Sequence, residues 1–470
     1  MMRLRSLVPM LGLASIALFA AACTDDDVEL GGGAGEGGEP QEPEPGLGGD
    51  GGAGGNTNVG GACATDGAGT LVLDVTGLPD GVDPDIAIDG PDPQAVTSDG
   101  SLSLASGEYV VSAARVFDED PLVRTAYEPT ITAPSFCLGA DASHTVKVSY
   151  APIPSSNKLW MASGKDDELA GFSSADISET AALDASVSID TPGAGSIAFD
   201  KDGNLWAVGP TIGGDMLVRI PAAELGESGT REPDTTIKVP EIDCYPFINH
   251  IAFDPHGNLW LSACDEALHR LAAEDLATSG DKESDVLLAA EEIINNQGIA
   301  FDAAGNLWVA GGPTLNRFEA ARLEISDTDA PDLQLSVSAA LGNTVLGPEE
   351  LAFDKAGNLW GVSGFTVFQI ASADLDQTGE KSVKANVSFD IDVLALPSTP
   401  AFDDGNGLWL SLSDGHFGRF SPTQLGRSVA AGTAVTPDVL ITTDSVTSGL
   451  PIALFPAPQG LPLYHSLPEE

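Results

Sequence analysis

The sequence predicts an all-β protein, and two observations carry that prediction. From residue 63 onward, short segments of alternating apolar and polar residues lie between turns rich in Gly, Pro and Asp, which is typical of half-buried strands. In addition, the six tryptophans all follow a leucine in one phrase that recurs about every fifty residues. They are Trp160, Trp206, Trp260, Trp308, Trp360 and Trp409. Such a repeat indicates units that bury their apolar faces against one another.

The overall charge restricts the partners of this chain. Its 470 residues include 70 acidic and 20 basic side chains, which gives a formal net charge of −50. A surface this acidic repels phosphate backbones and anionic lipid heads, which disfavours nucleic acid and electrostatic docking on a membrane. The length exceeds what one hydrophobic core usually organises, so two or more folded units are expected. We expect the protein to be a monomer.

The first 22 residues read as a targeting segment. Arg3 and Arg5 precede an apolar run that is too short to span a membrane with flanks and that ends in small residues before Cys23. This order resembles a bacterial lipoprotein signal peptide, although Ala20 stands where that family usually has Leu. The resemblance implies acylation of Cys23 and, because Thr24 rather than Asp follows it, an outer-membrane location. An ordinary cleaved signal peptide is the alternative.

Residues 23–62 join the acylation site to the folded part. After Cys23 the segment consists mainly of Gly, Pro, Glu and Asp with almost no large apolar side chain, so it cannot offset the entropy of ordering. We predict a disordered, acidic tether that holds the folded part away from the membrane.

Residues 63–150 are predicted to form a small β-sandwich of about seven short strands. The stretch Gly77 to Ala113, with its Gly-Leu-Pro-Asp-Gly start, resembles the transthyretin-like or carboxypeptidase-regulatory-like accessory sandwiches of bacterial surface proteins. No catalytic constellation occurs in it, which favours a spacer or adhesion module.

Four cysteines remain after Cys23, an even number that suits an oxidising compartment. Of the three possible connectivities, the simplest is local pairing, Cys63 with Cys137 and Cys244 with Cys264. No Cys-x-x-Cys motif or close His accompanies them, which argues against a zinc site.

Residues 151–470 contain the repeat, and its units follow one pattern. An apolar strand ends in Phe-Asp, a tight turn follows, and the second strand carries the Trp. The Asp can bond the amides ahead of it, and we assign this structural role to Asp200, Asp254, Asp302, Asp354 and, with slips in the motif, Asp403. A third strand, a short helical turn and a fourth strand complete each unit.

Four antiparallel strands repeated six times predict a β-propeller. We expect the first strand of each unit to line the central channel and the tryptophans to pack between neighbouring blades. The first unit lacks its first strand, and residues 450–465 resemble the first two strands of a unit without its Asp and Trp, so the tail is expected to complete the first blade. Because Leu159–Ser163 and Leu461–His465 could both be second strands, a seven-bladed ring stays open beside the six-bladed one.

The motif from Ile299 to Gly311 resembles NHL-type repeats and the related gluconolactonase-like, strictosidine-synthase-like and streptogramin-lyase propellers. The resemblance covers roughly residues 157–465 and implies a fold rather than an activity, since such folds host many functions. Lactonase-like members bind a divalent cation at the channel mouth, and carboxylate and amide oxygens suit calcium. That family's Glu-Gly-Pro motif is absent here.

Candidate binding residues lie in loops that a propeller brings to one face, around the channel mouth. They are His250, Gln297, Glu349, Glu350, Asp265 and His416. No residue is assigned as catalytic or metal-binding, and no Gly-x-Ser-x-Gly elbow supports serine chemistry. We therefore predict non-catalytic binding of a protein or glycan. The first alternative is a calcium-dependent lactonase or hydrolase. The second is a streptogramin-lyase-like enzyme, in which His250 and Glu349 would have to converge across the channel.

Overall fold

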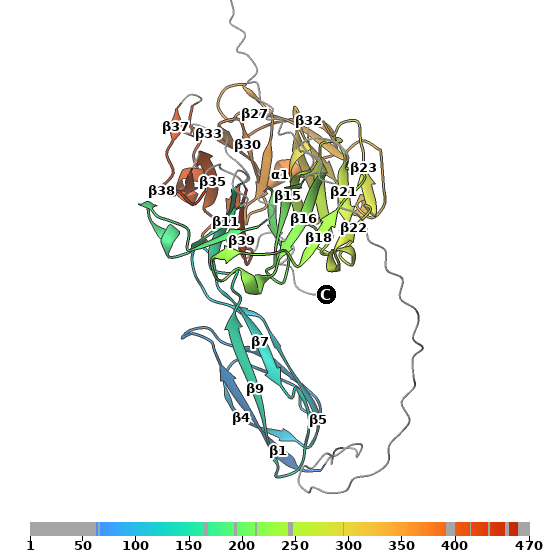
Figure 1. Ribbon diagram of the computed structural model, residues 1–470, viewed down its shortest axis with the longest axis vertical. Coiled ribbons are helices and arrows are strands. Elements are labelled where there is room, and N and C mark those ends of the chain that lie inside the picture. Colours follow the sequence, from blue (N-terminus) through green and yellow to red (C-terminus); the bar gives the residue numbers. More distant parts are fainter. Residues whose placement is uncertain are drawn as a thin grey trace, which may run out of the picture. The chain divides into compact units, whose positions relative to one another are not determined.

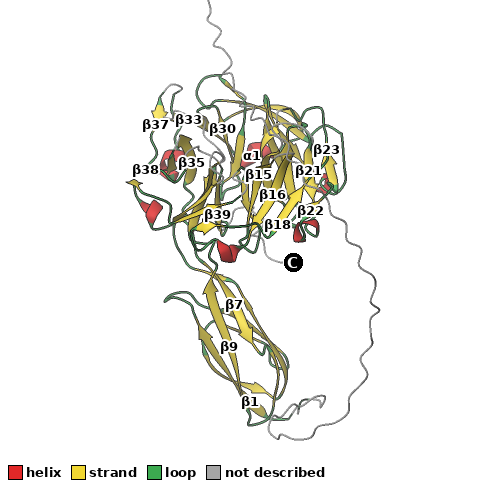
Figure 2. Cartoon of the chain, viewed as in Figure 1, coloured by secondary structure: helices red, strands yellow, loops and turns green. Residues whose placement is uncertain are grey.

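The computed structural model describes residues 63, 66–163, 168–191, 195–211, 214–242, 248–294, 296–391, 400–413, 415–430, 433–446 and 451–458. The signal peptide, Cys23 and the linker lie outside this part, as does Cys244, so their predictions are not tested. Strands dominate throughout, with only short helical turns between them (Figures 1 and 2). No helix in the described part is long and apolar enough to cross a membrane.

Residues 66–152 form two sheets, which we call the two-sheet region. One sheet has the order β4 (Gly100–Ala105), β1 (Ala68–Thr76), β9 (Ser143–Pro152), β7 (Ala126–Thr132) and β6 (Val116–Phe117). The other has the order β3 (Gln94–Val96), β2 (Asp85–Asp89), β5 (Gly107–Ala114) and β8 (Ser135–Leu138). Alternate residues of β2 and β5 are buried, and they share one core with β1 and β9. The period-two pattern thus places one face of each sheet inside.

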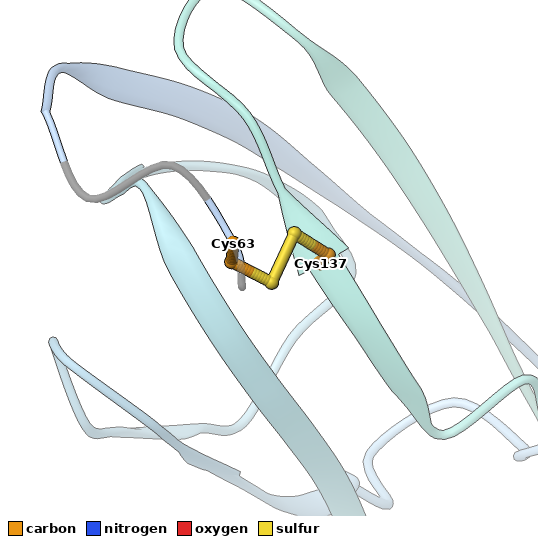
Figure 3. Close-up of a disulfide and its surroundings, with 2 residues drawn as sticks. All are labelled: Cys63 and Cys137. Atoms are coloured by element: carbon orange, nitrogen blue, oxygen red, sulfur yellow. A yellow bond between two sulfur atoms is a disulfide. The ribbon is translucent and has the colours of Figure 1, made fainter. Parts of the chain in front are cut away.

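A disulfide fastens the start of the described chain to the two-sheet region. Cys63 is bonded to Cys137 in β8, 74 residues further along (Figure 3). This confirms the first predicted pair. Cys264 is also disulfide-bonded, while its predicted partner lies outside the described residues.

The rest of the described chain forms six sheets with a common strand order, which confirms a β-propeller fold. The strands of each sheet are given from the channel outward. The sheet of the first unit consists of β39 (Ile452–Phe455), β10 (Lys158–Ser163), β11 (Glu168–Ser173) and β13 (Val187–Asp190). The sheet of the second unit consists of β14 (Ile197–Phe199), β15 (Leu205–Thr211), β16 (Gly214–Ile220) and β18 (Thr235–Lys238). The next two are β19 (Ile248–Phe253), β20 (Leu259–Ala263), β21 (Leu268–Leu271), β23 (Val286–Leu288), and β24 (Asn296–Phe301), β25 (Leu307–Gly311), β26 (Thr314–Phe318), β27 (Leu333–Ser338). The last two are β29 (Glu350–Phe353), β30 (Leu359–Ser363), β31 (Thr366–Ile370), β33 (Val387–Ile391), and β34 (Ala401–Phe402), β35 (Leu408–Ser413), β36 (His416–Phe420), β38 (Val439–Thr442).

Short elements connect and border these sheets. The predicted helical turn follows the third strand of each unit as η1 (Asp176–Ser178), η2 (Ala222–Glu224), η3 (Asp275–Ala277), η4 (Ala320–Arg322), α1 (Ser372–Leu375) and α2 (Pro422–Leu425). Five outer strands, β13, β18, β27, β33 and β38, each pair in parallel with one strand of the following unit. The partner strands are, in the same order, β17 (Gly229–Thr230), β22 (Gly280–Asp281), β32 (Gly379–Lys384), β37 (Ala434–Val435) and β12 (Ala181–Ala182). β27 additionally pairs with β28 (Val345–Leu346). These pairings cover outer edges that would otherwise be open to other chains.

The chain ends join the last unit to the first in two places. Near the channel, β39 pairs antiparallel with β10, so Leu159 stands opposite Leu454. At the outer edge, β12 of the first unit pairs with β38 of the last. The inner strands contact one another in cyclic order, β14, β19, β24, β29, β34, β39 and back to β14. The tail therefore supplies the first strand that the first unit lacks, whereas residues 461–465 lie outside the described part.

The six tryptophans are buried, with at most 2% of each side chain exposed. The first five contact the Phe that ends the inner strand of the following unit, with ring centroids 6.0 to 6.4 Å apart in edge-to-face geometry. The sixth, Trp409, contacts Phe417 at 5.9 Å and shares a core with Leu454 of β39. The structure thus places the tryptophans between neighbouring sheets, where aromatic pairs add to the burial of apolar area.

The repeated Asp closes the turn between the first two strands and holds the Trp. In the fifth unit, Asp354 Oδ1 accepts hydrogen bonds from the backbone N–H groups of Ala356 and Asn358. Its Oδ2 accepts from Asn358 Nδ2 and from Trp360 Nε1, both at 2.9 Å. Asp200, Asp254 and Asp302 make the same set of bonds. This buried carboxylate is satisfied by donors on each oxygen, as burial of a charge requires.

The sixth unit forms the same kind of turn, with the positions of its Gly and Asn exchanged. Asn406 takes the left-handed position, φ 59°, that Gly occupies in the other turns, and Gly407 takes the place of their Asn. A Cβ at Gly407 would meet the guanidinium of Arg419, which bonds Asp403 where the Asn amide would. The slip in the sequence motif is therefore a swap compensated by an arginine.

Candidate functional site

The inner strands of units two to five differ at the residue just before their shared apolar triplet. That position holds Ser196, His250, Gly298 and Glu350 in successive units. The triplets themselves are alike, Ile/Leu-Ala-Phe, and their outer residues are buried. Because the inner strands run in the same direction around the channel, these four residues form one layer at its mouth. We call them the mouth layer.

Two predicted candidates meet in this layer from units that are not adjacent. His250 Nε2 of the third unit lies 3.8 Å from Glu350 Oε2 of the fifth unit. Gly298 of the fourth unit stands between them, and a Cβ added to it would lie 2.9 Å from Glu350 Oε2 and 2.8 Å from Glu350 Cα. The absence of a side chain at Gly298 is therefore what lets the carboxylate reach His250. A lyase-like site would have required His250 to converge with Glu349; the residue that lies beside His250 is Glu350.

His250 is buried and uncharged at neutral pH. Only 7% of the residue is exposed, and burial lowers its pKa from the ordinary 6.5 to about 4. Within the described part of the chain, its Nδ1 has no hydrogen-bond partner. The contact with Glu350 is thus one between a carboxylate and a neutral imidazole, which offers one donor and one acceptor.

Below the mouth layer lies a central cavity of about 160 Å³. It is lined by the apolar triplets of all six inner strands, with Pro458 of the tail also in its wall. Of the candidate residues predicted from the sequence, His250 alone belongs to the lining.

Gln297 and Glu349 also lie at the starts of the inner strands, where their backbones make hydrogen bonds. The carbonyl oxygen of Gln297, whose side chain is exposed, accepts a hydrogen bond from Ser262 Oγ at 2.6 Å. Glu349 donates its N–H to Val362 and accepts from the N–H of Gly298, each at 2.8 Å. These bonds fix the strand starts that carry His250 and Glu350.

Asp265 belongs to a different cluster, on the turn between the second and third strands of its unit. Its Oδ2 lies 2.9 Å from His269 Nε2, and His269 Nδ1 lies 3.0 Å from Ser284 Oγ. Burial acts to raise the pKa of Asp265, but the hydrogen bond and charge of His269 outweigh it and the net pKa is lowered. Glu241, from the preceding unit, accepts the N–H of Ser284. Asp265 was predicted at the channel mouth; its carboxylate bonds His269 of its own unit, and it does not belong to the described lining of the cavity.

The sequence did not indicate this chain of contacts, since its members come from β21 and from three separate loops. The order Asp265, His269, Ser284 resembles the donor chain of serine hydrolases, yet His269 is buried to 1% exposure. We interpret it as a link between the outer loops of neighbouring units.

His416 is the first residue of β36 and stands opposite Thr442 of β38. It is half-buried and does not belong to the described lining of the cavity. The structure therefore does not bring His416 together with His250.

Within the described residues, no three His, Cys, Asp or Glu side chains are placed to share a metal ion.

Sequence reasoning missed Ser196 and Gly298. Ser196 Oγ accepts the N–H of Ile251, at 3.0 Å, and so joins the second unit to the third at the mouth. Aligning the units on their apolar triplet would have shown both residues at the position of His250 and Glu350.

These features define a β-propeller with an asymmetric mouth layer. No protein-family model and no curated protein matches the chain. It is similar to the solved WD40 β-propeller domain of Doa1, with 14% identity and a TM-score of 0.37, over 60% of this chain and 80% of that one. It is also similar to a protein of unknown function from Bacteroides caccae, with 10% identity and a TM-score of 0.38, over 60% of this chain and 97% of that one.

Proposed function

We propose that this chain is a lipid-anchored protein of the cell envelope that binds a protein or glycan, without catalysis, at the mouth of its propeller. The mouth layer carries the proposal. There the units differ while the rest of the inner strands repeats, and the differing side chains of His250 and Glu350 meet. Variation on a rigid repeated scaffold is how repeat proteins build binding surfaces.

The attachment of the two-sheet region supports the same proposal. Arg115 donates to the carbonyl of Lys201, and Arg124 pairs with Asp404 at 3.0 Å and donates to the carbonyl of Ala457. Lys201 and Asp404 lie in the turns that follow the inner strands, at the other end of the channel from His250. These contacts of the two-sheet region are therefore made away from the mouth layer, which stays accessible to a ligand.

Cys23 would provide the anchor in this proposal. Mass spectrometry of the mature protein should find a diacylated or triacylated N-terminal Cys23, since multiple acyl chains anchor firmly. A mature protein that begins at Met1 or Asp25 would refute the anchor while leaving the mouth untested.

The binding proposal can be tested with two mouth variants, Glu350→Gln and His250→Gln. Wild-type protein is first screened on a glycan array and a panel of purified envelope proteins, and any hit is titrated by calorimetry. We expect both variants to weaken that binding at least tenfold. The control Glu283→Gln, at an exposed position outside the mouth layer, should leave it unchanged. Equal affinities in all four proteins would show that the mouth layer is not the binding surface.

The alternative, a calcium-dependent lactonase at the same mouth, has one observation in its favour: two adjacent carboxylates, Glu349 and Glu350. An enzyme of this kind should bind a stoichiometric divalent ion and lose thermal stability when chelated. If a chelator changes neither the melting temperature nor the hydrolysis of a lactone and ester panel, this alternative fails.

A further inference from the structure

The channel beneath the mouth layer has the character of a small-molecule site. One alanine from each inner strand belongs to its wall, and each is partly exposed while its neighbours in the triplet are mostly buried. They are Ala198, Ala252, Ala300, Ala352, Ala401 and Ala453. Methyl groups at these positions leave space that larger side chains would fill, so the cavity follows from the repeated sequence.

The size of the space limits what it can hold. A volume of about 160 Å³ is close to that of a buried apolar cavity of about 150 Å³ that takes up benzene. A sugar ring would bring several hydroxyl groups into this wall. His250 is the one described lining residue with a polar side chain, so those hydroxyls would lose hydrogen bonds to water without sufficient replacement.

His250 defines the polar end of the cavity. Its neutral ring lies in the wall, with Nε2 directed to Glu350 at 3.8 Å and Nδ1 without a partner among the described residues. Nδ1 is itself enclosed, so a hydrogen bond to a ligand falls to the part of the ring that faces the cavity. A ligand with one hydroxyl or N–H group would hydrogen-bond the imidazole, while its apolar body packs against the alanines.

We propose that the channel binds a small uncharged molecule with a benzene-sized apolar body and a single hydrogen-bonding group placed at His250. This site goes beyond the protein or glycan surface proposed above and shares only His250 with it, so Ala300→Leu tests the cavity apart from that surface. A charged ligand is disfavoured because the apolar wall supplies no counter-charge. The chemical class is therefore a phenol or a similarly sized alcohol.

Phenol and benzene serve as probes, and ligand-observed NMR titration of the full-length protein measures its affinity for each. We expect saturable binding of both, with phenol the tighter. Ala300→Leu should weaken both at least tenfold because the longer side chain occupies the cavity, whereas Ala277→Leu, at an exposed position of η3, changes neither. His250→Leu should reduce the affinity for phenol to that for benzene.

Two results would overturn the proposal: no saturable binding to the wild type, or Ala300→Leu affinities equal to those of the wild type. Circular dichroism checks that each variant is folded. If Ala300→Leu does not fold, Ala352→Val in the same ring of alanines replaces it, with the same expected loss and the same contrary result.

Discussion

The two ends of each inner strand differ in how they use the repeat. At the end near the turn, units two to five place the same Asp, Asn and Trp in the same hydrogen bonds. At the mouth end, the corresponding residues are Ser, His, Gly and Glu. Three residues thus separate a position that the fold constrains in units two to five from one at which these units differ. The comparison teaches that repetition marks stability and that departures from it mark the candidate binding surface.

Removing a tryptophan tests the constrained end most severely. Trp308 is fully buried, contacts Phe353 at 6.2 Å and donates to Asp302 at 3.0 Å. We expect Trp308→Ala to lower the free energy of unfolding by about 3–5 kcal/mol, since a large cavity opens between two blades. Guanidinium unfolding measures this loss. A near-neutral result would place the Trp in a binding role instead.

The mouth end should show its own signature in the pH dependence of stability. Because the folded pKa of His250 is lowered from 6.5 to about 4, the unfolded chain binds a proton first as the pH falls. Stability is therefore complete above pH 6.5 and declines by about 3 kcal/mol towards pH 4. His250→Gln should remove this part of the decline, while His256→Gln, at an exposed turn position, should retain it. Unfolding curves at several pH values check this, and parallel declines in all three proteins would contradict it.

The sixth unit allows the repeated turn to be rebuilt. Gly407→Asn restores the residue of the other turns but meets Arg419, which should cost about 2 kcal/mol of stability from overpacking. Adding Arg419→Gln copies the fifth unit, where Gln369 holds that position, and should recover most of the loss. A double-mutant cycle on unfolding free energies measures the coupling. Additive losses would show that the arginine does not stand in for the asparagine.

The sequence was sufficient for the parts of this fold that repeat. The period of the tryptophans and the Phe-Asp turn predicted the propeller, and the missing strand before Trp160 predicted that the tail would complete the first unit. These predictions worked because each rests on local hydrogen bonds or on contacts between equivalent positions of neighbouring units.

The candidate site was predictable only in part. The loops that carry His250 and Glu350 could be placed at the mouth from strand direction. Their pairing could not, because it depends on the missing side chain of Gly298 in the unit between them. The bond of Asp265 to His269 was likewise not predictable, since nothing in the sequence pairs these two side chains.

The smallest expected effect gives the most direct test of the comparison. Glu350 begins β29 and Asp354 directly follows it, so Asp354→Asn and Glu350→Gln make the same carboxylate-to-amide change at the two ends of one strand segment. The measurement is the free energy of unfolding of each variant in guanidinium at pH 7. We predict a loss of about 2 kcal/mol for Asp354→Asn, which leaves the donors of Asn358 and Trp360 without their acceptor. We predict a change below about 0.5 kcal/mol for Glu350→Gln. Equal losses, or a larger loss at Glu350, would contradict the division between a structural end and a binding end.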